Sequence, residues 1–296
     1  MTIPVDGIDL RSTLSPLTML AQDPTVAAAP GRFARATLTP EGPGTITVSW
    51  TDGGSEARVE TVGDGAAWLA DRAPALLGCH DDVRGFAPDT PPLRDLWRRH
   101  RGDRIARTAT VWHDLAWTVV QQRVTRQDAA AQWRRLVAAL GTPAPGGSGL
   151  VVPPEPATVA RLGYHDLHRF GIERRRAEHL LHAARAAHRL PRLGDEPVGR
   201  ALPLLRAVPG IGPWTCTSLA VHTWGEPDTV IVGDDGIPSM VGWLLAREAR
   251  ADDARMIELL EPHRPHRYRV VRLAFAAQVR PPRRHPRGRR TDIRGR

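Results

Sequence analysis

The sequence predicts an α+β protein, in which a small N-terminal domain with an antiparallel sheet precedes an all-helical domain. Three observations lead to this prediction. β-Branched residues alternate with other residues at 45–50 and 56–62, which is typical of strands. Apolar residues recur at helical spacing from about residue 91 to 279. A proline-rich stretch near residue 90 separates the two patterns.

The N-terminal domain is expected to cover residues 1–90. Within it, RFARATLTP, TITVSW and SEARVETV are separated by the turns EGPG and TDGG, which predicts two or three antiparallel strands. Residues 65–78 follow as a helix that closes with a glycine. The stretch FAPDTPPL then marks the end of the domain.

The second domain is expected to cover residues 91–279 and to be helical. Residues 141–156, GTPAPGGSGLVVPPEP, are too rich in glycine and proline for a helix and predict a long loop. Two helices before the turn at 209–212 are separated by Gly171. The expected helical segments are 95–104, 112–140, 157–171, 172–190, 202–208, 214–224, 236–250, 253–260 and 267–279.

Composition limits the class of protein. The chain has 296 residues, of which 41% are hydrophobic and 25% charged, as in globular proteins. No apolar run is long enough to span a bilayer, and the first residues lack a basic region followed by an apolar stretch. The two cysteines, Cys79 and Cys216, cannot form a disulfide framework or a four-cysteine metal site. We therefore expect a cytoplasmic protein without a membrane partner.

The net charge of +9 is concentrated at one end. Residues 280–296 hold eight arginines and one aspartate, a net of +7, which leaves about +2 for the rest of the chain. We expect a disordered basic tail, which either contacts phosphates or simply stays solvated.

The chain contains no lysine, so all 41 basic residues are arginine. A guanidinium does not form a Schiff base. This excludes chemistry that depends on a lysine-derived imine.

The sequence VPGIGPWT lies between two helical segments. Pro209 ends the first helix, while Gly210 and Gly212 permit a tight turn and leave no side chain in the way. The amides at the start of the next helix can then bind a phosphate oxygen. Asp234 follows 22 residues after Gly212 and precedes another helix. Alone, the turn fits any helical bundle and the acid fits an ordinary helix cap.

Taken together, VPGIGPWT and VIVGDDGI resemble the helix-hairpin-helix DNA glycosylases with a catalytic aspartate, and most closely the AlkA-type 3-methyladenine DNA glycosylases. LLGCHDD, DLAWTVVQQRVT and FGIERRRAEHLLHAARA resemble further segments of the family, in the same order. The resemblance covers most of the chain. It implies a helix-hairpin-helix catalytic domain that removes damaged, above all alkylated, purines flipped out of duplex DNA.

The resemblance assigns the catalytic role to Asp234, with Asp235 as the lesser candidate. A fixed carboxylate near C1′ stabilises the positive charge that builds on the deoxyribose, and it can orient a water. Members that also cut the strand carry a lysine two residues after the last hairpin glycine, where this chain has Trp214. The resemblance therefore implies a monofunctional enzyme. No cofactor is expected, and an iron–sulfur cluster is excluded because its four C-terminal cysteines are missing.

The resemblance also implies binding residues. Gln122 and Arg123 would fill the gap left by the flipped base, unless they lie on a solvated helix face. Trp214, Ser218 and His266, with Tyr268 beside it, would line the base pocket, although Trp214 also fits a core position and His266 a surface position. The DNA-binding hairpin would comprise Val208, Gly210, Ile211, Gly212 and Thr215, and a monovalent cation would use the carbonyls of Arg206, Val208 and Ile211.

Two alternatives stay open. The first is a non-catalytic DNA-binding protein on the same fold, because Ser218 and His266 stand where the resemblance places pocket aromatics. The second is a glycosylase for oxidised or deaminated purines. In either case duplex DNA is the expected partner, the chain is expected to be a monomer, and in the cell it would associate with the nucleoid through DNA.

Overall fold

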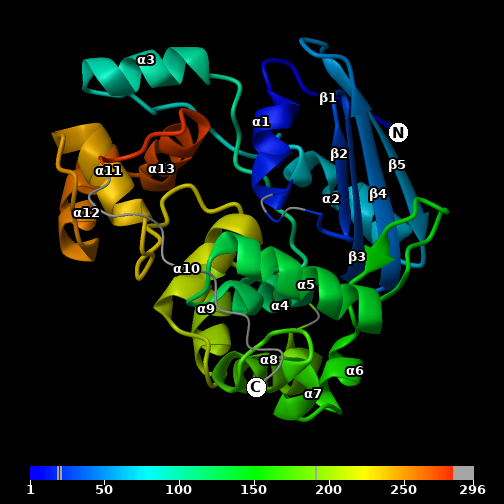
Figure 1. The fold of residues 1–296 in the computed structure, drawn as a ribbon. Coiled ribbons are helices and arrows are strands. Elements are labelled where there is room, and N and C mark those ends of the chain that lie inside the picture. The colour runs from blue at the N-terminus through cyan, green and yellow to red at the C-terminus, as the bar shows by residue number, and fades with distance from the viewer. Residues whose placement is uncertain (19, 21, 191, 283–296) are drawn as a thin grey trace.

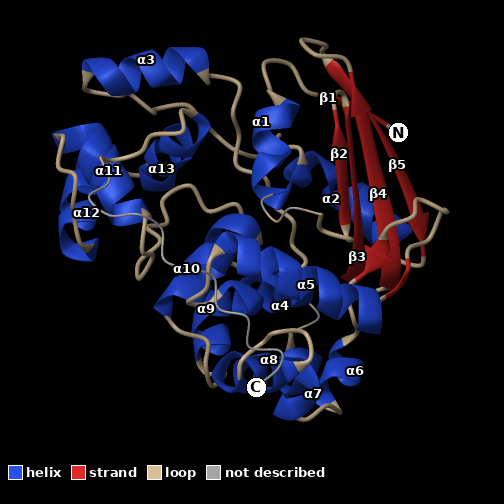
Figure 2. Cartoon of the chain, viewed as in Figure 1, coloured by secondary structure: helices blue, strands red, loops and turns tan. Residues whose placement is uncertain are grey.

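The computed structural model describes residues 1–18, 20, 22–190 and 192–282. It confirms the α+β prediction: a five-stranded antiparallel sheet forms one side of the molecule, and helices form the rest (Figures 1 and 2). Within these ranges no helix is both long and apolar enough to cross a membrane. Most of the tail predicted for residues 280–296 lies outside the described residues.

The sheet has the strand order β1-β5-β4-β3-β2. The three predicted strands are present as β3, β4 and β5. The two edge strands were not predicted, because β1 has only three residues and the alanines of β2 show no alternation. The strands are β1 (Thr2–Pro4), β2 (Val26–Ala29), β3 (Arg32–Thr39), β4 (Gly42–Trp50) and β5 (Glu56–Gly63).

Helix α2 (Ala66–Leu76) covers one face of the sheet and matches the predicted segment, although Pro74 lies inside it. Trp68 and Leu69 of α2 share a core with Phe33, Ile46 and Val48 of the sheet. Helix α1 (Leu10–Leu14) and the short 3₁₀ helix η1 (Ser15–Thr18) contribute Leu10, Leu14 and Leu17 to the same core. They lie between the sheet and the helices of the second half (Figure 1).

The helices after residue 90 enclose two separate cores. The first contains Trp133, Leu136 and Leu180, which are fully buried. Its helices are α4 (Val111–Gln121), α5 (Arg126–Leu140), α6 (Pro156–Ala160), α7 (Tyr164–His168), α8 (Arg174–Ala186), α9 (Val198–Arg206) and α10 (Pro213–His222). Between them lie β6 (Thr142–Pro143), β7 (Val151–Val152), η2 (Ala187–Arg189) and η3 (Leu193–Asp195).

The second core contains Met256, Leu260 and Val270. It is built from α3 (Pro91–Arg99), α11 (Ile237–Ala246), α12 (Asp253–Leu260), η4 (Glu261–His263) and α13 (Arg267–Ala276). Helix α3 precedes the first core in the chain but packs against α11 and α13. The predicted helical region thus consists of two lobes, and the division at residue 90 stays a prediction.

Several predicted helices have different bounds. The segment 112–140 is broken at residues 122–125, where Arg123 takes φ +56°. Thr125 caps α5, since its Oγ1 accepts the amide hydrogen of Asp128 (3.2 Å) and donates to the Asp128 carboxylate (2.6 Å). The segment 157–171 splits into α6 and α7. The segment predicted at 95–104 begins at Pro91, because proline is favoured in a first helical turn.

Buried polar contacts join the sheet to the first helical lobe. Arg35 of β3 donates to Asp114 of α4 (2.7 Å), and both side chains are almost completely buried. The same carboxylate accepts the hydroxyls of Thr108, Thr110 and Thr223. These contacts fix the position of the sheet relative to α4.

Candidate nucleic-acid interface and base cavity

The turn between α9 and α10 is a compact hairpin. The amide of Val208 donates to Leu205 O (3.0 Å), and the amide of Ile211 donates to Val208 O (3.1 Å). Both side chains are buried, so they anchor the turn. Any contact of Val208 or Ile211 with DNA is therefore a contact of the backbone.

The two hairpin glycines differ in what surrounds them. Gly210 has φ +88°, and a Cβ there would lie 2.1 Å from His179 Cδ2. Glycine is thus required at this position by the protein itself. At Gly212 a Cβ would meet no protein atom within 4 Å. The open side of the hairpin at Gly212 leaves room for another molecule to approach the backbone.

Helix α10 begins at Pro213, directly after the hairpin. The first-turn amides of a helix have no partner within it and carry the positive end of its dipole. The amides of Trp214 and Thr215 are in this position. Hairpin and helix start therefore form a candidate anion-binding surface made of backbone amides.

The prediction for Gln122 is wrong. Its side chain is buried, and its Nε2 donates to Gly210 O (3.1 Å) and to Thr215 Oγ1 (2.9 Å). Its Oε1 accepts a hydrogen bond from His179 Nδ1 (2.8 Å). A side chain held by three bonds braces the hairpin and is not free to enter DNA. The same contacts bury the side chain of Thr215, which leaves that residue only its amide for DNA.

Arg123 differs from Gln122 in its surroundings. It is exposed and lies in the break between α4 and α5. Val124 next to it lines the cavity described below. Its role in filling the gap left by a flipped base stays a prediction.

Asp234 lies in the loop before α11 and is held by three donors. Its Oδ1 accepts the amides of Gly236 (2.9 Å) and Ile237 (3.0 Å), and its Oδ2 accepts Trp214 Nε1–H (3.1 Å). Asp234 therefore binds amides at the start of α11, whose N-cap residue is Gly236, and lies at the cavity as well. Asp234 lines the cavity, whereas the exposed Asp235 does not belong to its lining.

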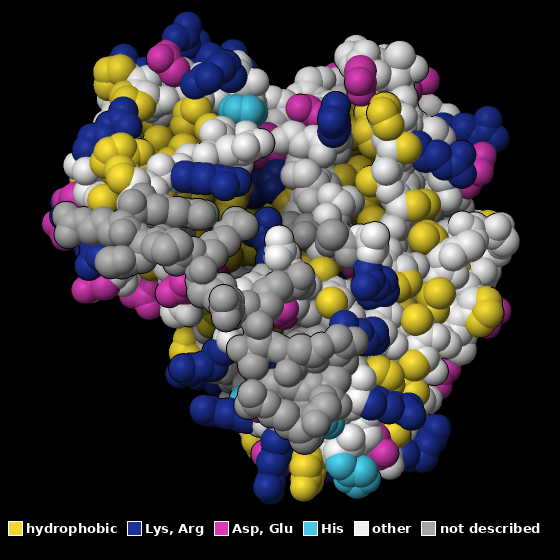
Figure 3. Space-filling model, viewed as in Figure 1, with side chains coloured by type: hydrophobic (Ala, Val, Ile, Leu, Met, Phe, Trp, Pro, Cys, Tyr) yellow, Lys and Arg dark blue, Asp and Glu magenta, His cyan; other side chains and the backbone are white. Residues whose placement is uncertain are grey.

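A cavity of about 540 Å³ lies where the sheet domain and both helical lobes meet. Segments α1 and η1 contribute one wall, α4 and α10 a second, and α11 and α13 a third. Trp214, Ser218 and Tyr268 line it, in agreement with the predicted pocket. In the space-filling view arginine side chains lie around the hollow between the lobes (Figure 3).

The prediction for His266 is wrong. Its ring is buried outside the cavity, with Nε2 3.2 Å from Arg84 O and the ring edge against Phe86 (5.6 Å between centroids). Helix α13 starts one residue later, so its cavity face begins with Tyr268. Tyr268 therefore supplies the aromatic wall that was expected from His266.

The lining residues that were not predicted as site residues include Trp117, His222 and Arg272. Trp117 and His222 meet edge to face, with centroids 5.6 Å apart. The apolar spacing of 112–140 suggested a core role for Trp117. A signal existed for Arg272, because an arginine within the apolar run VVRLAF must be paired if it is buried.

Burial sets the charge state of two lining groups. It lowers the pKa of His222 to about 4 and raises the pKa of Tyr268 to about 12. Both are therefore uncharged at neutral pH. Their rings offer neutral polar atoms next to the tryptophans.

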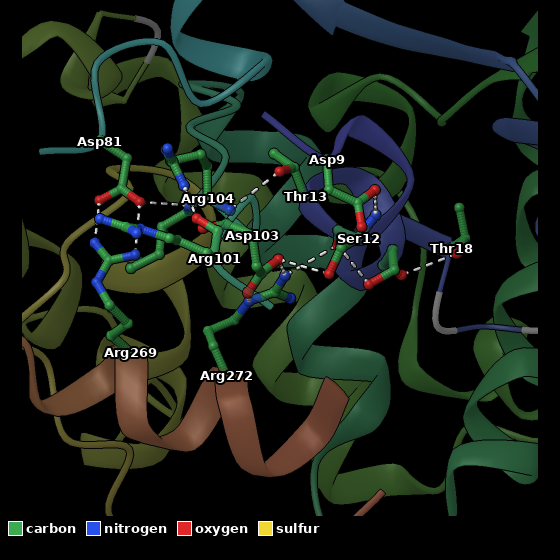
Figure 4. Close-up of polar contacts among 12 residues, drawn as sticks. Asp9, Ser12, Thr13, Thr18, Asp81, Arg101, Asp103, Arg104, Arg269 and Arg272 are labelled. Carbon is green, nitrogen blue, oxygen red and sulfur yellow. Dashed lines mark hydrogen bonds and ion pairs between the residues drawn. The ribbon is translucent and has the colours of Figure 1, made fainter. Parts of the chain in front are cut away.

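Two buried ion pairs attach α13 to the rest of the molecule (Figure 4). Arg269 pairs with Asp81 through Nη2 (2.6 Å) and Nη1 (3.0 Å). Arg272 pairs with Asp103 through Nε (3.1 Å) and Nη2. Of the two arginines only Arg272 lines the cavity.

Within the described ranges no group of three His, Cys, Asp or Glu side chains could hold a metal ion. The carbonyls of Arg206, Val208 and Ile211 come from a single turn, and that of Val208 also accepts the Ile211 amide. Because a carbonyl oxygen has two lone pairs, these groups fit a monovalent cation, which stays a prediction.

No protein-family model matches the chain. It is 25% identical over 156 residues to a putative DNA-3-methyladenine glycosylase, YfjP, of Bacillus subtilis. It is 30% identical over 149 residues to a probable bifunctional transcriptional activator/DNA repair enzyme AlkA of Mycobacterium tuberculosis. These matches cover 50% of this chain, 52% of the first relative and 30% of the second.

The 3-methyladenine DNA glycosylase of Archaeoglobus fulgidus has a similar structure, with a TM-score of 0.79 and 18% identity. The match covers 93% of this chain and 97% of that one. This likeness shows a shared fold over nearly the whole chain. Together with the two relatives, it confirms the resemblance inferred from VPGIGPWT and VIVGDDGI.

Proposed function

We propose that this chain, which has the fold of the helix-hairpin-helix DNA glycosylases, hydrolyses the N-glycosidic bond of damaged purines flipped out of duplex DNA. One observation carries the proposal: Asp234 lines a base-sized cavity and is bonded to Trp214, the second residue of the helix that follows the hairpin. The group that grips a backbone phosphate and the group that faces the sugar are thus fixed relative to each other.

The hairpin would hold the DNA backbone without reading sequence. Its open side at Gly212 and the amides of Trp214 and Thr215 suit a phosphate oxygen. Arg123 would enter the space left by the flipped base. The Gln122 brace keeps these groups in place through Gly210.

The flipped purine would lie in the cavity between aromatic side chains. In the reaction the bond between C1′ and the base nitrogen breaks, and the base leaves with the electron pair. The positive charge that develops on the sugar is stabilised by the Asp234 carboxylate, whose three hydrogen bonds keep it from reorienting. A water oxygen then bonds to C1′, and its proton is released.

We propose that the enzyme is monofunctional and leaves an intact abasic site. The chain has no lysine, and the position two residues after Gly212 is Trp214. An imine between enzyme and sugar therefore cannot form through a lysine amine. We further propose that the enzyme acts without a cofactor and as a monomer. Its proposed location is the cytoplasm, at the nucleoid.

The name of the Bacillus subtilis relative points to an alkylated purine, 3-methyladenine. Oxidised or deaminated purines are the alternative within the same chemistry. The non-catalytic alternative was motivated by the missing pocket aromatics at Ser218 and His266, but Tyr268, Trp117 and Trp214 line the cavity instead. That finding supports the enzyme.

The test uses purified protein and duplexes with a methylated or a deaminated purine. We expect base release by the wild type and a loss of about 100-fold or more in Asp234→Asn, since a fixed charge at the reacting carbon contributes on that order. Asp235→Asn is the control and should retain activity. Duplex binding should persist in all three proteins. Binding by the wild type without release from any of these duplexes would contradict the proposed reaction on methylated and deaminated purines.

A further inference from the structure

The loop before α11, residues 229–236, carries Asp234 and is held in two different ways. The apolar side chains at 230–232 pack against the second core. Gly233 has no side chain to pack, and it takes φ +77°. The position of Asp234, the next residue, therefore depends on hydrogen bonds and not on apolar packing.

One hydrogen bond ties the backbone next to Asp234 to another element. The Gly233 amide donates to Asp253 Oδ2 (2.8 Å). Asp253 is the first residue of α12, which packs against α11 (Figure 1). In the described part of the chain, no other backbone group of residues 233–235 is hydrogen-bonded to a different element. The bond to Asp253 thus fixes the chain one residue before Asp234.

The cap of α12 does not explain this use of Asp253. Asp252 is the N-cap residue, and its Oδ1 accepts the amide hydrogen of Arg255 (2.9 Å). An acid in the first turn also interacts favourably with the helix dipole, but it does so from an exposed position as well. Asp253 instead directs its carboxylate to a separate loop.

The second oxygen of this carboxylate shows what that direction costs. Asp253 Oδ1 is buried and has no hydrogen-bond partner among the described residues. A buried polar atom without a partner is unfavourable, and its persistence in a folded protein calls for an explanation. The bond from Gly233 to Oδ2 supplies one, because no other hydrogen bond involves this side chain in the described ranges.

We propose that Asp253 is a positioning residue for the glycosylase reaction, which holds Gly233 so that the Asp234 carboxylate stays directed into the cavity. The proposal rests on the function proposed above and adds a residue outside the cavity lining. Asp253 does not touch the base or the sugar. It acts through Gly233 and the peptide bond that joins Gly233 to Asp234.

The two supports of Asp234 come from different lobes. Trp214 on α10 holds Oδ2 from the first lobe (3.1 Å), and Asp253 on α12 holds the preceding residue from the second. The electrostatic contribution of a carboxylate to a transition state depends on its being fixed before the reaction. Loss of Asp253 should therefore slow base release and leave duplex binding nearly unchanged.

The first experiment measures single-turnover base release and binding with a duplex that contains a methylated purine. Asp253→Ala should release the base more slowly by about tenfold or more, as for the loss of one charge-assisted hydrogen bond. Its dissociation constant for the duplex should change less than about threefold. Asp253→Asn keeps a side-chain oxygen for the Gly233 amide and should release the base within about threefold of the wild-type rate.

The matched control is Asp252→Ala, which removes one negative charge and a helix cap from the same turn but no bond to Gly233. It should lower the melting temperature and still release the base within about threefold of the wild-type rate. The proposal is overturned if Asp252→Ala loses as much release as Asp253→Ala, or if Asp253→Asn is as slow as Asp253→Ala. The stability of α12 or its charge would then explain the effect.

A second measurement separates this proposal from the glycosylase function, because it needs no turnover. NMR follows the exchange of the Trp214 Nε1 hydrogen with water, which the bond to Asp234 slows, and Trp214→Phe assigns the signal. This exchange should be about tenfold faster in Asp253→Ala and nearly unchanged in Asp253→Asn and Asp252→Ala. Unchanged exchange in Asp253→Ala contradicts the positioning role even where its base release is slow. Absence of release by the wild type, with faster exchange in Asp253→Ala, contradicts only the proposed reaction.

Discussion

Trp214 connects the two parts of the site through one side chain. It is the second residue of α10, so its amide belongs to the candidate anion-binding surface at the hairpin. Its indole lines the cavity and donates to Asp234 Oδ2. A shift of the hairpin would therefore move the carboxylate. The tryptophan that stands here instead of a lysine therefore has two structural roles, because Trp214 orients the Asp234 carboxylate and also lines the cavity.

His222 gives the molecule a pH dependence whose sign can be worked out. Burial lowers its pKa to about 4 in the folded state from 6.5 in the unfolded state. Between these values the unfolded chain binds more protons, so stability falls as pH decreases from about 6.5 to about 4. Each such group contributes a slope of about 1.4 kcal/mol per pH unit.

We therefore expect His222→Gln to reduce the slope of the unfolding free energy against pH in this window by about 1.4 kcal/mol per pH unit. Denaturant titrations at half-unit pH steps measure it. His80 is the matched control, because its exposed ring stays in water in both states. A variant with the wild-type slope would show that His222 is not desolvated. His113, also buried with a lowered pKa, retains its own contribution.

The placement of individual residues could be predicted from the sequence where backbone chemistry decides, but not where packing decides, and the roles of the site residues stay predictions. Asp234, Gly210 and Trp214 occupy positions that the motif determines. Gln122 and His266 were misassigned, because the direction of a side chain depends on partners far away in the chain. Gln122 is turned inward by Gly210 and Thr215, and His266 by Arg84 and Phe86.

At the scale of elements, the two glycines of the hairpin are expected to matter for different reasons, Gly210 for stability and Gly212 for DNA binding. Gly210→Ala should destabilise the fold by about 1 kcal/mol or more, because its φ is +88° and the new Cβ would collide with His179. Gly212→Ala should leave the melting temperature nearly unchanged but weaken duplex binding severalfold, because the methyl group would occupy the open space at the hairpin.

Thermal unfolding and anisotropy with an undamaged duplex measure both effects on the same two variants. Gly199→Ala, another glycine with no atom near its Cβ position, serves as the control for open sites. If Gly212→Ala binds DNA as well as Gly199→Ala does, the hairpin is not the phosphate contact.

The broken segment at residues 122–125 shows what element prediction lacked. Apolar spacing continues across the break, since Val120 and Val124 fit one helical stripe. Only the polar residues indicate that the helix ends here, because Thr125 and Asp128 form a capping pair at the start of α5. This signal was present in the sequence. The positive φ of Arg123 could not be predicted from the sequence, because it results from the way the chain turns between α4 and α5.

At the scale of the whole molecule, three separately packed bodies meet at one cavity. The order of segments along the chain does not reveal this, since α3 packs against α13 although the two helices are far apart in the sequence. The fold class followed from two periodicities. The cavity did not, because its walls come from α1, α4, α10 and α13, and only tertiary packing brings these together.

The contact between the sheet and α4 carries the last prediction. Arg35 and Asp114 are both buried, and removing one partner of such a pair typically costs about 3–5 kcal/mol, because it leaves a desolvated charge. We expect this loss of unfolding free energy in Arg35→Met. Arg58→Met is the matched control on the same sheet. Its ion pair with Glu60 is 73% and 55% exposed, so its loss should cost less than about 1 kcal/mol.

The double variant Arg35→Met with Asp114→Asn tests whether the cost is that of an orphaned charge. Since no charge remains buried, it should be more stable than the sum of its single variants predicts, and the coupling between the sites should exceed about 1 kcal/mol. Urea titrations of the four proteins give these values. Additive losses would show that the two charges act independently. The sheet and α4 would then be held together by the threonine hydroxyls around Asp114 and not by the ion pair.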